Sequence, residues 1–334
     1  MFDPAQRVEL GRTGVKITRV GFGCAPIGNL HSVVAEEDAQ AAIAAAFNDG
    51  VRFIDAAPFY GYGLAEERAG RALAKWRRED FVLSTKVGRL IRPGARAGTE
   101  VFDGGKSFYL ANDEMHTELD YSYDGVMRSL EDSLRRWNVD RIDILHIHDP
   151  DEHFEQAVNG AYKALDRLRS EGTISAVSAG MNQWQMLARF MDHGRFDCFL
   201  LAGRYSLLDQ SSLPEFLPKC LAQGVSVIVG GVFNSGLLAN PERGATYDYT
   251  PASEEMLARA LRIKAACERH GVPLRAAALQ FPLAHPAVAA ILTGIRTRAE
   301  WEQNRGGLSL DIPAALWADL KHEGLLAADA PVPA

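Results

Sequence analysis

The sequence is poor in the residues that hold disulfide-stapled scaffolds together. Its 334 residues include only four cysteines, and none of them forms a C-x-x-C pair. Scattered cysteines in a chain of this length do not make a disulfide framework, so we expect a reducing compartment. Cys198 and Cys267 lie in apolar or helical runs, which indicates core positions for both.

Long hydrophobic runs are also missing. No uncharged apolar segment approaches the roughly 20 residues that span a bilayer. The opening residues MFDPAQRVEL lack the basic and then apolar pattern of a signal peptide. We therefore expect a cytoplasmic protein that has no membrane partner.

A basic excess is absent as well. The formal net charge is -7 and the sequence pI is about 5.8, whereas a surface that binds nucleic-acid phosphates needs an excess of Lys and Arg. We expect no nucleic-acid partner. A G-x-G-x-x-G motif is not present either, because Gly21, Gly23 and Gly28 have a different spacing, and this argues against a Rossmann fold.

The sequence does contain a regular alternation of short apolar runs and amphipathic helical segments. The alternation predicts a parallel sheet throughout, and its continuity over eight strands favours a closed (β/α)8 TIM barrel, an α/β fold. The expected strands are 18–23, 52–55, 81–86, 142–148, 173–179, 197–202, 225–230 and 288–294.

Three other segments complete the expected domain, a single barrel over residues 1–334. Residues 7–17 predict an N-terminal β-hairpin around Gly11 and Gly14, and residues 325–334 a loose tail. Residues 88–121, after the third strand, form a long irregular loop. Its aromatic residues favour a functional lid; they are Phe102, Phe108, Tyr109 and Tyr121.

The carboxyl ends of the strands are where a barrel of this kind builds its active site. The second strand ends in Asp55, with Tyr60 just after it; the third ends in Lys86 and the fourth in His148. Each residue alone has a commoner structural use, as a turn cap, a packed ring, a solvated charge or a core histidine. Together, on neighbouring strand ends, they favour a catalytic site.

These four groups can manage a proton at a carbon–oxygen centre. A free tyrosine has a pKa near 10, and a nearby ammonium group lowers it by stabilising the phenolate. Asp55 would hold Lys86 charged and aimed, Tyr60 would give or take the proton, and His148 would orient the reacting oxygen. This chemistry needs neither a nucleophile nor a metal.

A metal site is the competing interpretation. His146 and His148 form H-x-H on one strand and face the same side, and Asp149, Asp151 and His153 follow. No histidine ends the later strands, so we expect no metal site and interpret His146 as a packing residue. A non-catalytic nucleotide sensor on the same fold is a further alternative.

The chain resembles the aldo-keto reductases along nearly its whole length. The matching segments are GRTGVKITRVGFG, GVRFIDAAPFYGYGLAEERAGRAL, STKVG, DRIDILHIHDPD, GTISAVS, GLL at 236–238 and ILTGIRTRAEWEQN at 291–304. The resemblance implies a barrel that binds NAD(P)(H) in an extended conformation. It also implies the tetrad Asp55, Tyr60, Lys86 and His148, with Tyr60 as the general acid/base.

The resemblance further implies a set of cofactor-binding residues, which are Gly23, Asn182, Tyr205, Gly230, Asn234, Gly236, Leu237, Gly294, Arg296, Arg298, Glu300 and Asn304. The family usually places Ser-Asn, Gln and Tyr around the nicotinamide, where this sequence has Gly180-Met181, Ala202 and Gly230. Gly294 replaces a common Lys, and Glu300 would repel a 2′-phosphate but accept a hydrogen bond from a ribose hydroxyl. The expected cofactor is NAD, with NADP as the alternative.

The variants GMNQ, LAGRYSLLDQ and GGVFNSGLL resemble a subgroup that contains sugar dehydrogenases. The resemblance implies oxidation of an aldose of the L-fucose or D-threo type at C1 to the lactone. Pyridoxal 4-dehydrogenase chemistry and NADPH-dependent aldehyde or ketone reduction are the alternatives. Phe59, Trp137 or Tyr62 and the 88–121 loop are the expected pocket walls, and a small molecule is the expected partner. The oligomeric state stays open.

Overall fold

The computed structural model describes residues 3–101, 107–248 and 250–333. Eight parallel strands close into a barrel in the order β10-β11-β14-β3-β4-β5-β8-β9. The strands are β3 (Val20–Gly23), β4 (Phe53–Asp55), β5 (Val82–Val87), β8 (Ile144–His148), β9 (Ala176–Met181), β10 (Cys198–Ala202), β11 (Ser226–Gly230) and β14 (Val288–Gly294). The predicted (β/α)8 barrel is confirmed; most strands differ by one to three residues at one end.

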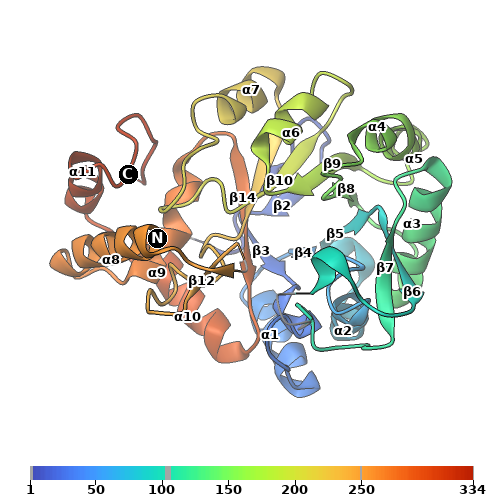
Figure 1. Ribbon diagram of the computed structural model, residues 1–334, viewed down its shortest axis with the longest axis horizontal. Coiled ribbons are helices and arrows are strands. Elements are labelled where there is room, and N and C mark those ends of the chain that lie inside the picture. The colour runs from blue at the N-terminus through green and yellow to red at the C-terminus, as the bar shows by residue number, and fades with distance from the viewer. Residues whose placement is uncertain (1–2, 102–106, 249, 334) are drawn as a thin grey trace.

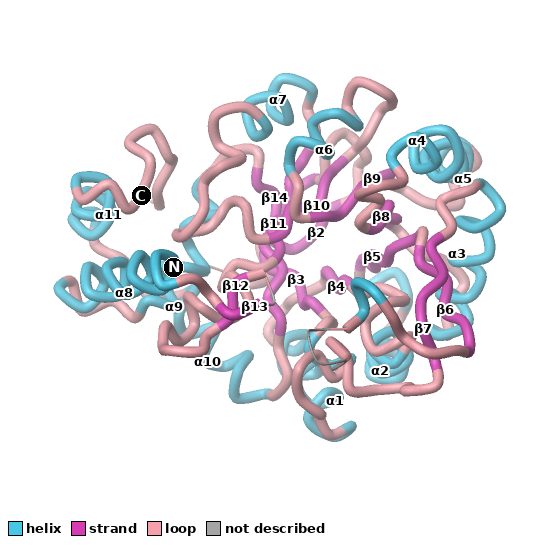
Figure 2. The backbone as a smooth tube through the Cα atoms, viewed as in Figure 1, coloured by secondary structure: helices cyan, strands magenta, loops and turns pink. Residues whose placement is uncertain are grey.

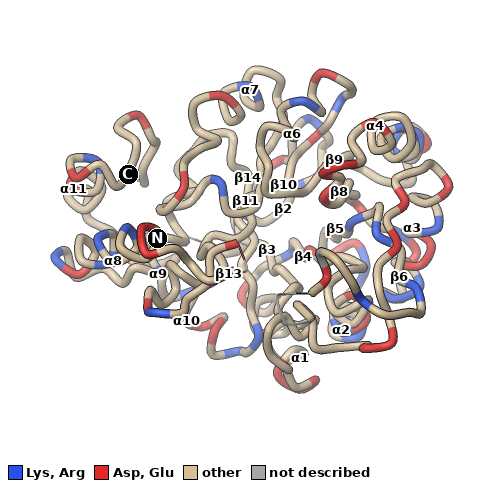
Figure 3. Tube along the Cα trace, in the orientation of Figure 1, with Lys and Arg blue, Asp and Glu red and all other residues tan. Residues whose placement is uncertain are grey.

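Helices surround the barrel, as Figure 1 shows. They are α1 (Glu36–Asn48), α2 (Leu64–Leu73), α3 (Tyr123–Trp137), α4 (Phe154–Gln156), α5 (Lys163–Ser170), α6 (Trp184–Phe190), α7 (Phe216–Gln223), α8 (Glu254–Arg269), α9 (Leu274–Gln280), α10 (Arg298–Leu308) and α11 (Ala314–His322). A π-helical stretch, Ala157–Tyr162, lies between α4 and α5. Acidic and basic residues lie interspersed on the outer helices (Figure 3).

Two hydrophobic clusters hold the barrel together. The larger one fills the layer between strands and helices, where alternate strand side chains point outward. The smaller one fills the barrel interior with side chains such as Phe53, Ile144 and Leu292. Leu10 and Ile17 of the N-terminal hairpin belong to this inner cluster. The hairpin, β1 (Arg7–Glu9) paired with β2 (Lys16–Thr18), is confirmed and covers the amino-terminal end of the barrel.

The segment after β5 is more regular than the sequence predicts. Within residues 88–121, β6 (Arg89–Pro93) and β7 (Met115–Leu119) pair as antiparallel strands, so among the described residues the irregular part is confined to those between them (Figure 2). Its two ends meet, because Asp120 N donates to Gly88 O over 3.0 Å. The predicted aromatic Phe102 lies outside the described residues. We call residues 88–121 the insert.

Two features were not predicted. Between β11 and α8, the short strands β12 (Thr246–Tyr247) and β13 (Thr250–Pro251) pair with each other. The chain end, expected to be loose, packs on the core instead: Leu325, Leu326 and Ala330 are buried. Arg259 Nη2 donates to Leu325 O over 2.7 Å and helps to fix it. Burial of these three apolar side chains stabilises the chain end against the core.

All four cysteines are free and buried, as expected for Cys198 and Cys267. Among the described residues, no helix combines the length and the apolar character needed to cross a membrane.

Candidate active site

The tight crossing of two loops sets the position of Tyr60. Gly61 has φ +67°, and a Cβ there would lie 2.5 Å from Gly28 O, while a Cβ on Gly28 would lie 2.7 Å from the Tyr60 carbonyl carbon. Only glycine allows both the left-handed backbone and this approach. The loop after β3 therefore packs directly against the turn after β4, which carries Tyr60.

Lys86 is the centre of the polar group beneath Tyr60. Its Nζ lies 2.7 Å from Asp55 Oδ2, donates to Ala56 O over 2.8 Å, and lies 4.6 Å from the centroid of the Tyr60 ring. Lys86 and Asp55 are almost fully buried. Burial raises the pKa of Asp55, and the bonds from Lys86 and from Ser84 Oγ oppose that shift, which keeps the carboxylate paired with the ammonium.

His148 completes the group from the end of β8. Its ring centroid lies 6.0 Å from that of Tyr60, with the ring planes nearly perpendicular. Burial, and then the positive charges of Arg89 and Lys86, lower the pKa of His148 well below its ordinary value. The imidazole is therefore neutral near pH 7 and can hydrogen-bond an oxygen without adding charge. The structure thus brings together all four residues that the strand ends predict.

His146 lies two residues before His148 on β8, deeper in the barrel, and is fully buried. Its Nδ1 lies 2.7 Å from Ser178 Oγ, and its Nε2 lies 3.6 Å from Asp55 Oδ1. Burial lowers its pKa well below the ordinary value, so His146 stays neutral as well. Within the described part of the chain, no cluster of three or more His, Cys, Asp or Glu has the arrangement of a metal site.

A cavity of about 360 Å³ opens above the tetrad. One wall is aromatic, with Phe59, Phe108 and Tyr109, and the ring centroids of Phe59 and Tyr109 lie 5.1 Å apart. Another wall is charged, with Arg89, Asp149 and Asp151, and Arg204 and Asp248 lie at a third side. The cavity can therefore receive a ligand that has both an apolar face and several polar groups.

The expected walls are only partly correct. Phe59 and the insert line the cavity. Trp137 does not: it is buried at the end of α3, where its Nε1 donates to Glu66 Oε1 over 3.2 Å. Tyr62 is also buried, under the guanidinium of Arg96, which lies 3.8 Å from the centroid of the Tyr62 ring. Tyr62 follows Tyr60 in the turn after β4, and Trp137 is the last residue of α3. The packing directs both side chains away from the cavity.

The insert is tied to the Tyr60 turn. Asn112 Nδ2 donates to Gly61 O and Tyr62 O, over 3.1 Å in both cases. Arg96 donates to the carbonyl oxygens of Met115, Tyr109 and Asn112 and so fixes the irregular part of the insert. These contacts hold Tyr109 beside Tyr60, with ring centroids 5.9 Å apart.

The expected cofactor residues fall into two groups. Asn182 lines the cavity directly after β9, and its Nδ2 lies 3.5 Å from Asp248 Oδ1. Gly23 ends β3 between Gly294 and Asp55, and Gly230 ends β11. Gly236 forms an isolated bridge with Thr246. Arg298 pairs with Glu302, Nε to Oε1 at 2.7 Å.

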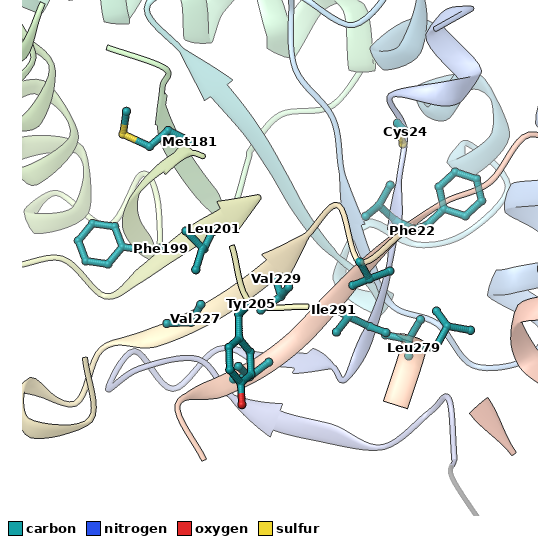
Figure 4. Packing of buried hydrophobic residues seen from close by; sticks show 14 of the residues in the cluster. Phe22, Cys24, Met181, Phe199, Leu201, Tyr205, Val227, Val229, Leu279 and Ile291 are labelled. Carbon is teal, nitrogen blue, oxygen red and sulfur yellow. The ribbon is translucent and has the colours of Figure 1, made fainter. Parts of the chain in front are cut away.

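The second group is buried in the protein. Tyr205 is fully buried and packs against Phe281, with ring centroids 5.2 Å apart, and Figure 4 shows it among apolar side chains of the core. Its side chain thus faces the core and not the cavity, and its assignment to the cofactor site stays a prediction. Leu237 is likewise buried in the core. Asn234 Oδ1 accepts from Ser206 Oγ and Asn304 Oδ1 from Arg275 Nη1, so their side chains fix neighbouring segments.

Glu300 does not point freely outward. Its carboxylate accepts from Arg296 Nε over 2.9 Å and from Arg296 N over 2.7 Å. Thr297 Oγ1 in turn accepts from Glu300 N and caps α10. Glu300 and Arg296 thus form one unit at the end of β14.

The sequence did not predict several residues that line the cavity: Arg89, Arg204 and Asp248 carry no motif, and Asp149 is indicated only as part of a metal pattern. Arg204 donates to both carboxylate oxygens of Asp248, 44 residues away in sequence. Asp149 directly follows His148, so the rule that strand ends carry chemistry would have included it. The other residues carry no such signal in the sequence.

Comparisons with known proteins agree with this geometry. The profile described as "Aldo/keto reductase family" matches residues 19–322. The chain is 40% identical to pyridoxal 4-dehydrogenase of Microbacterium luteolum, over 96% of this chain and 98% of that protein. It is 38% identical to D-threo-aldose 1-dehydrogenase of a Pseudomonas species, over 94% and 96%. An aldo-keto reductase from Bacillus halodurans, solved in its holo form, has the same fold, with a TM-score of 0.73, 24% identity and 98% of both chains covered. The chain therefore belongs to the aldo/keto reductase family and is an oxidoreductase that uses a nicotinamide cofactor.

Proposed function

We propose that the protein oxidises an aldose at C1 to the corresponding lactone, with NAD as the preferred electron acceptor. The observation that carries the proposal is the position of Lys86, 2.7 Å from Asp55 Oδ2 and 4.6 Å from the centroid of the Tyr60 ring, at the floor of a cavity with a charged wall. The relative named D-threo-aldose 1-dehydrogenase supports the choice of substrate.

In the proposed reaction, Tyr60 acts as the general base. Its phenolate oxygen takes the proton of the anomeric hydroxyl, Lys86 stabilises the phenolate, and Asp55 holds Lys86 in place. His148, neutral, donates a hydrogen bond that fixes the same oxygen. As the C1–O bond becomes a carbonyl, C1 loses its hydrogen together with the bonding electron pair. The nicotinamide, when bound, supplies the acceptor for that hydrogen and electron pair.

The residues around the mouth of the barrel leave room for the planar nicotinamide ring. Gly180 and Gly230 lie on either side of Leu200, and a Cβ on Gly230 would lie 3.3 Å from Leu200 Cδ2, so a side chain there would fill the space. Asn182 would hold the carboxamide with its side-chain amide. Gly23, Gly236 and the backbones of Asn234 and Leu237 would follow the phosphates. Gly294, Arg296, Arg298 and Glu300 would surround the adenosine end.

Pyridoxal is the second candidate substrate. It is favoured by the aromatic wall of Phe59, Phe108 and Tyr109 and by the relative named pyridoxal 4-dehydrogenase. Against it stand the charged groups Arg89, Asp149 and Asp151, which suit a molecule with many hydroxyls better than an aromatic ring.

The test is a substrate panel with purified protein: L-fucose, D-arabinose and pyridoxal, each with NAD and with NADP. We expect NADH formation with the sugars and a lactone product. Reduction of aldehydes with NADPH alone, without sugar oxidation, would overturn the proposal in favour of a general reductase.

Tyr60→Phe then tests the catalytic role. We expect a loss of turnover of about 10²–10⁴-fold, the usual contribution of general acid–base catalysis, while NADH binding is retained. Tyr162→Phe is the matched control, because Tyr162 lies outside the cavity and its hydroxyl accepts from Arg195 N. Turnover by a Tyr60→Phe protein at the normal rate would exclude Tyr60 as the base.

A further inference from the structure

An ion pair joins the insert to the end of β8 inside the cavity. Arg89, the first residue of β6, donates from Nη2 to Asp149 Oδ2 over 3.1 Å, across 60 residues of sequence. Arg89 is only 8% exposed. Its guanidinium also lies 4.9 Å from the centroid of the Phe59 ring, next to Tyr60 in sequence. The pair therefore lies beside the catalytic group and not at the surface.

The guanidinium has hydrogen-bonding capacity that the protein leaves unused. Arg89 Nε is buried and has no hydrogen-bond partner among the described residues. A buried, unpaired donor on a charged group costs free energy, so such a group calls for an explanation. A purely structural ion pair would be expected to use the fork of the guanidinium with both carboxylate oxygens, as Arg204 and Asp248 do in the same cavity.

Asp149 is held in an unusual conformation next to His148. Its φ is +41°, in the left-handed region, and its Oδ2 lies 3.4 Å from His148 Nε2. Tyr121 at the end of the insert fixes this backbone, since its hydroxyl donates to His148 O and Asp149 O. Strained backbone of this kind persists where surrounding contacts enforce it, and it is common at ligand sites.

We propose that Arg89 and Asp149 together bind the hydroxyl on the carbon next to the reacting carbon, the C2 hydroxyl of an aldose. The proposal rests on the proposed function. His148 and Tyr60 hold the oxygen on C1, and the neighbouring oxygen of a sugar lies roughly 3 Å from it, one hydrogen-bond length. Asp149 Oδ2 lies 3.4 Å from His148 Nε2, so its carboxylate borders the place of that neighbouring oxygen. A hydroxyl both donates and accepts, so a carboxylate and a guanidinium side by side match it completely.

The decisive comparison uses two sugars that differ only at C2: D-arabinose, and 2-deoxy-D-ribose, which is D-arabinose without its C2 hydroxyl. A site built around a hydroxyl rejects the analogue that lacks it, because its buried polar groups stay unpaired. We expect the wild type to prefer D-arabinose by at least about 10-fold in kcat/KM. In Asp149→Asn and in Arg89→Met, this preference falls toward 1 because only the D-arabinose value drops.

Three further variants sharpen the result. Arg92→Met is the matched control: Arg92 is on the same strand but pairs with Glu118 at 3.2 Å, outside the cavity, and should leave both substrates unchanged. Arg89→Lys keeps the positive charge but loses the forked N–H donors of the guanidinium. It should retain part of the preference for D-arabinose that Arg89→Met loses. The double variant Arg89→Met/Asp149→Asn should lose little more than either single one, because both act on one hydroxyl. NADH binding, followed by fluorescence, confirms that each variant is folded.

The outcomes separate the two proposals. A wild-type protein that oxidises no aldose overturns the proposed function and this inference with it. A wild type that oxidises D-arabinose, with variants that lose activity equally on both sugars, overturns the inference alone and assigns the ion pair a structural role. If Arg89→Met does not fold, the preference of Asp149→Asn decides. An unchanged preference in that variant also overturns the inference.

Discussion

The ammonium group of Lys86 lies 2.7 Å from the carboxylate of Asp55, and both side chains are sealed from solvent. Such a pair is costly to bury and is strongly destabilised when only one partner is removed. Lys86 also faces the Tyr60 ring. The pair thus presents a fixed positive charge to the phenol from the interior of the barrel.

Lys86→Met should shift sugar oxidation to higher pH. Without the ammonium, the phenolate that Tyr60 needs as a base forms only at higher pH, so the rising limb of kcat/KM moves upward. At neutral pH we expect a loss of about 10²-fold or more. The measurement is the pH profile of kcat/KM. Lys75→Met, at an exposed lysine over Trp76, is the control. An identical profile for wild type and Lys86→Met would contradict this role.

The two buried histidines should make the protein less stable in acid. Burial lowers the pKa of His146 and of His148 well below the ordinary value, about 6.5, which both regain in the unfolded chain. Below pH 6.5 the unfolded state therefore binds more protons than the folded state. The free energy of unfolding then falls by up to about 1.4 kcal/mol per pH unit for each histidine.

Urea unfolding between pH 5 and 8 measures this dependence. His146→Asn should remove the contribution of one histidine to the slope below pH 6.5, whatever its effect on stability at pH 8. His322→Asn, at an exposed position of α11, should leave the slope unchanged. Equal slopes for wild type and His146→Asn would show that His146 takes up its proton in the folded state.

Glu300→Gln should increase the use of NADP. In the structure, Glu300 engages the guanidinium of Arg296. Its neutral replacement releases Arg296 to pair with a 2′-phosphate and removes a repulsive charge. We expect the ratio of kcat/KM for NADP to that for NAD to rise about 10-fold. Glu302→Gln, which releases Arg298 on the same helix, is the comparison. A larger gain from Glu302→Gln would move the phosphate site to Arg298.

Gly61→Ala should impair both folding and catalysis. The added Cβ would meet the Gly28 carbonyl at 2.5 Å, and the φ of +67° is itself unfavourable for alanine. Gly14→Ala separates the two effects, because Gly14 has φ +74° and open space around it. We expect about 1 kcal/mol of destabilisation for Gly14→Ala and roughly 2–4 kcal/mol for Gly61→Ala. Thermal unfolding measures both, and comparable losses would mean that the loop crossing relaxes.

The parts of this site that follow regular structure could be predicted from the sequence. Asp55 and His148 end their strands and Lys86 is the last residue but one of β5. Parallel strands bring their carboxyl ends to one edge of the barrel, so the pattern alone placed these residues together. Arg89 could not be placed in this way. Its partner depends on how the insert folds back as β6 and β7, and no periodicity records that.

Burial explains the other differences. Trp137 was expected in the pocket wall and Tyr205 at the cofactor, but aromatic residues bury a large apolar surface, and both lie in the core. The final residues were expected to be loose because chain ends are often poorly ordered, yet Leu325 and Leu326 are buried, and burial of their apolar side chains stabilises the packed end.

The two ends of the insert are hydrogen-bonded to each other, between Asp120 N and Gly88 O, where the segment leaves and rejoins the barrel. A segment closed in this way can lengthen, shorten or be exchanged during evolution without stretching the strands that carry Asp55, Lys86 and His148. Arg89, Phe108 and Tyr109 all belong to it. A change within the insert can therefore reshape the wall of the cavity while the strands that carry Asp55, Lys86 and His148 stay in place.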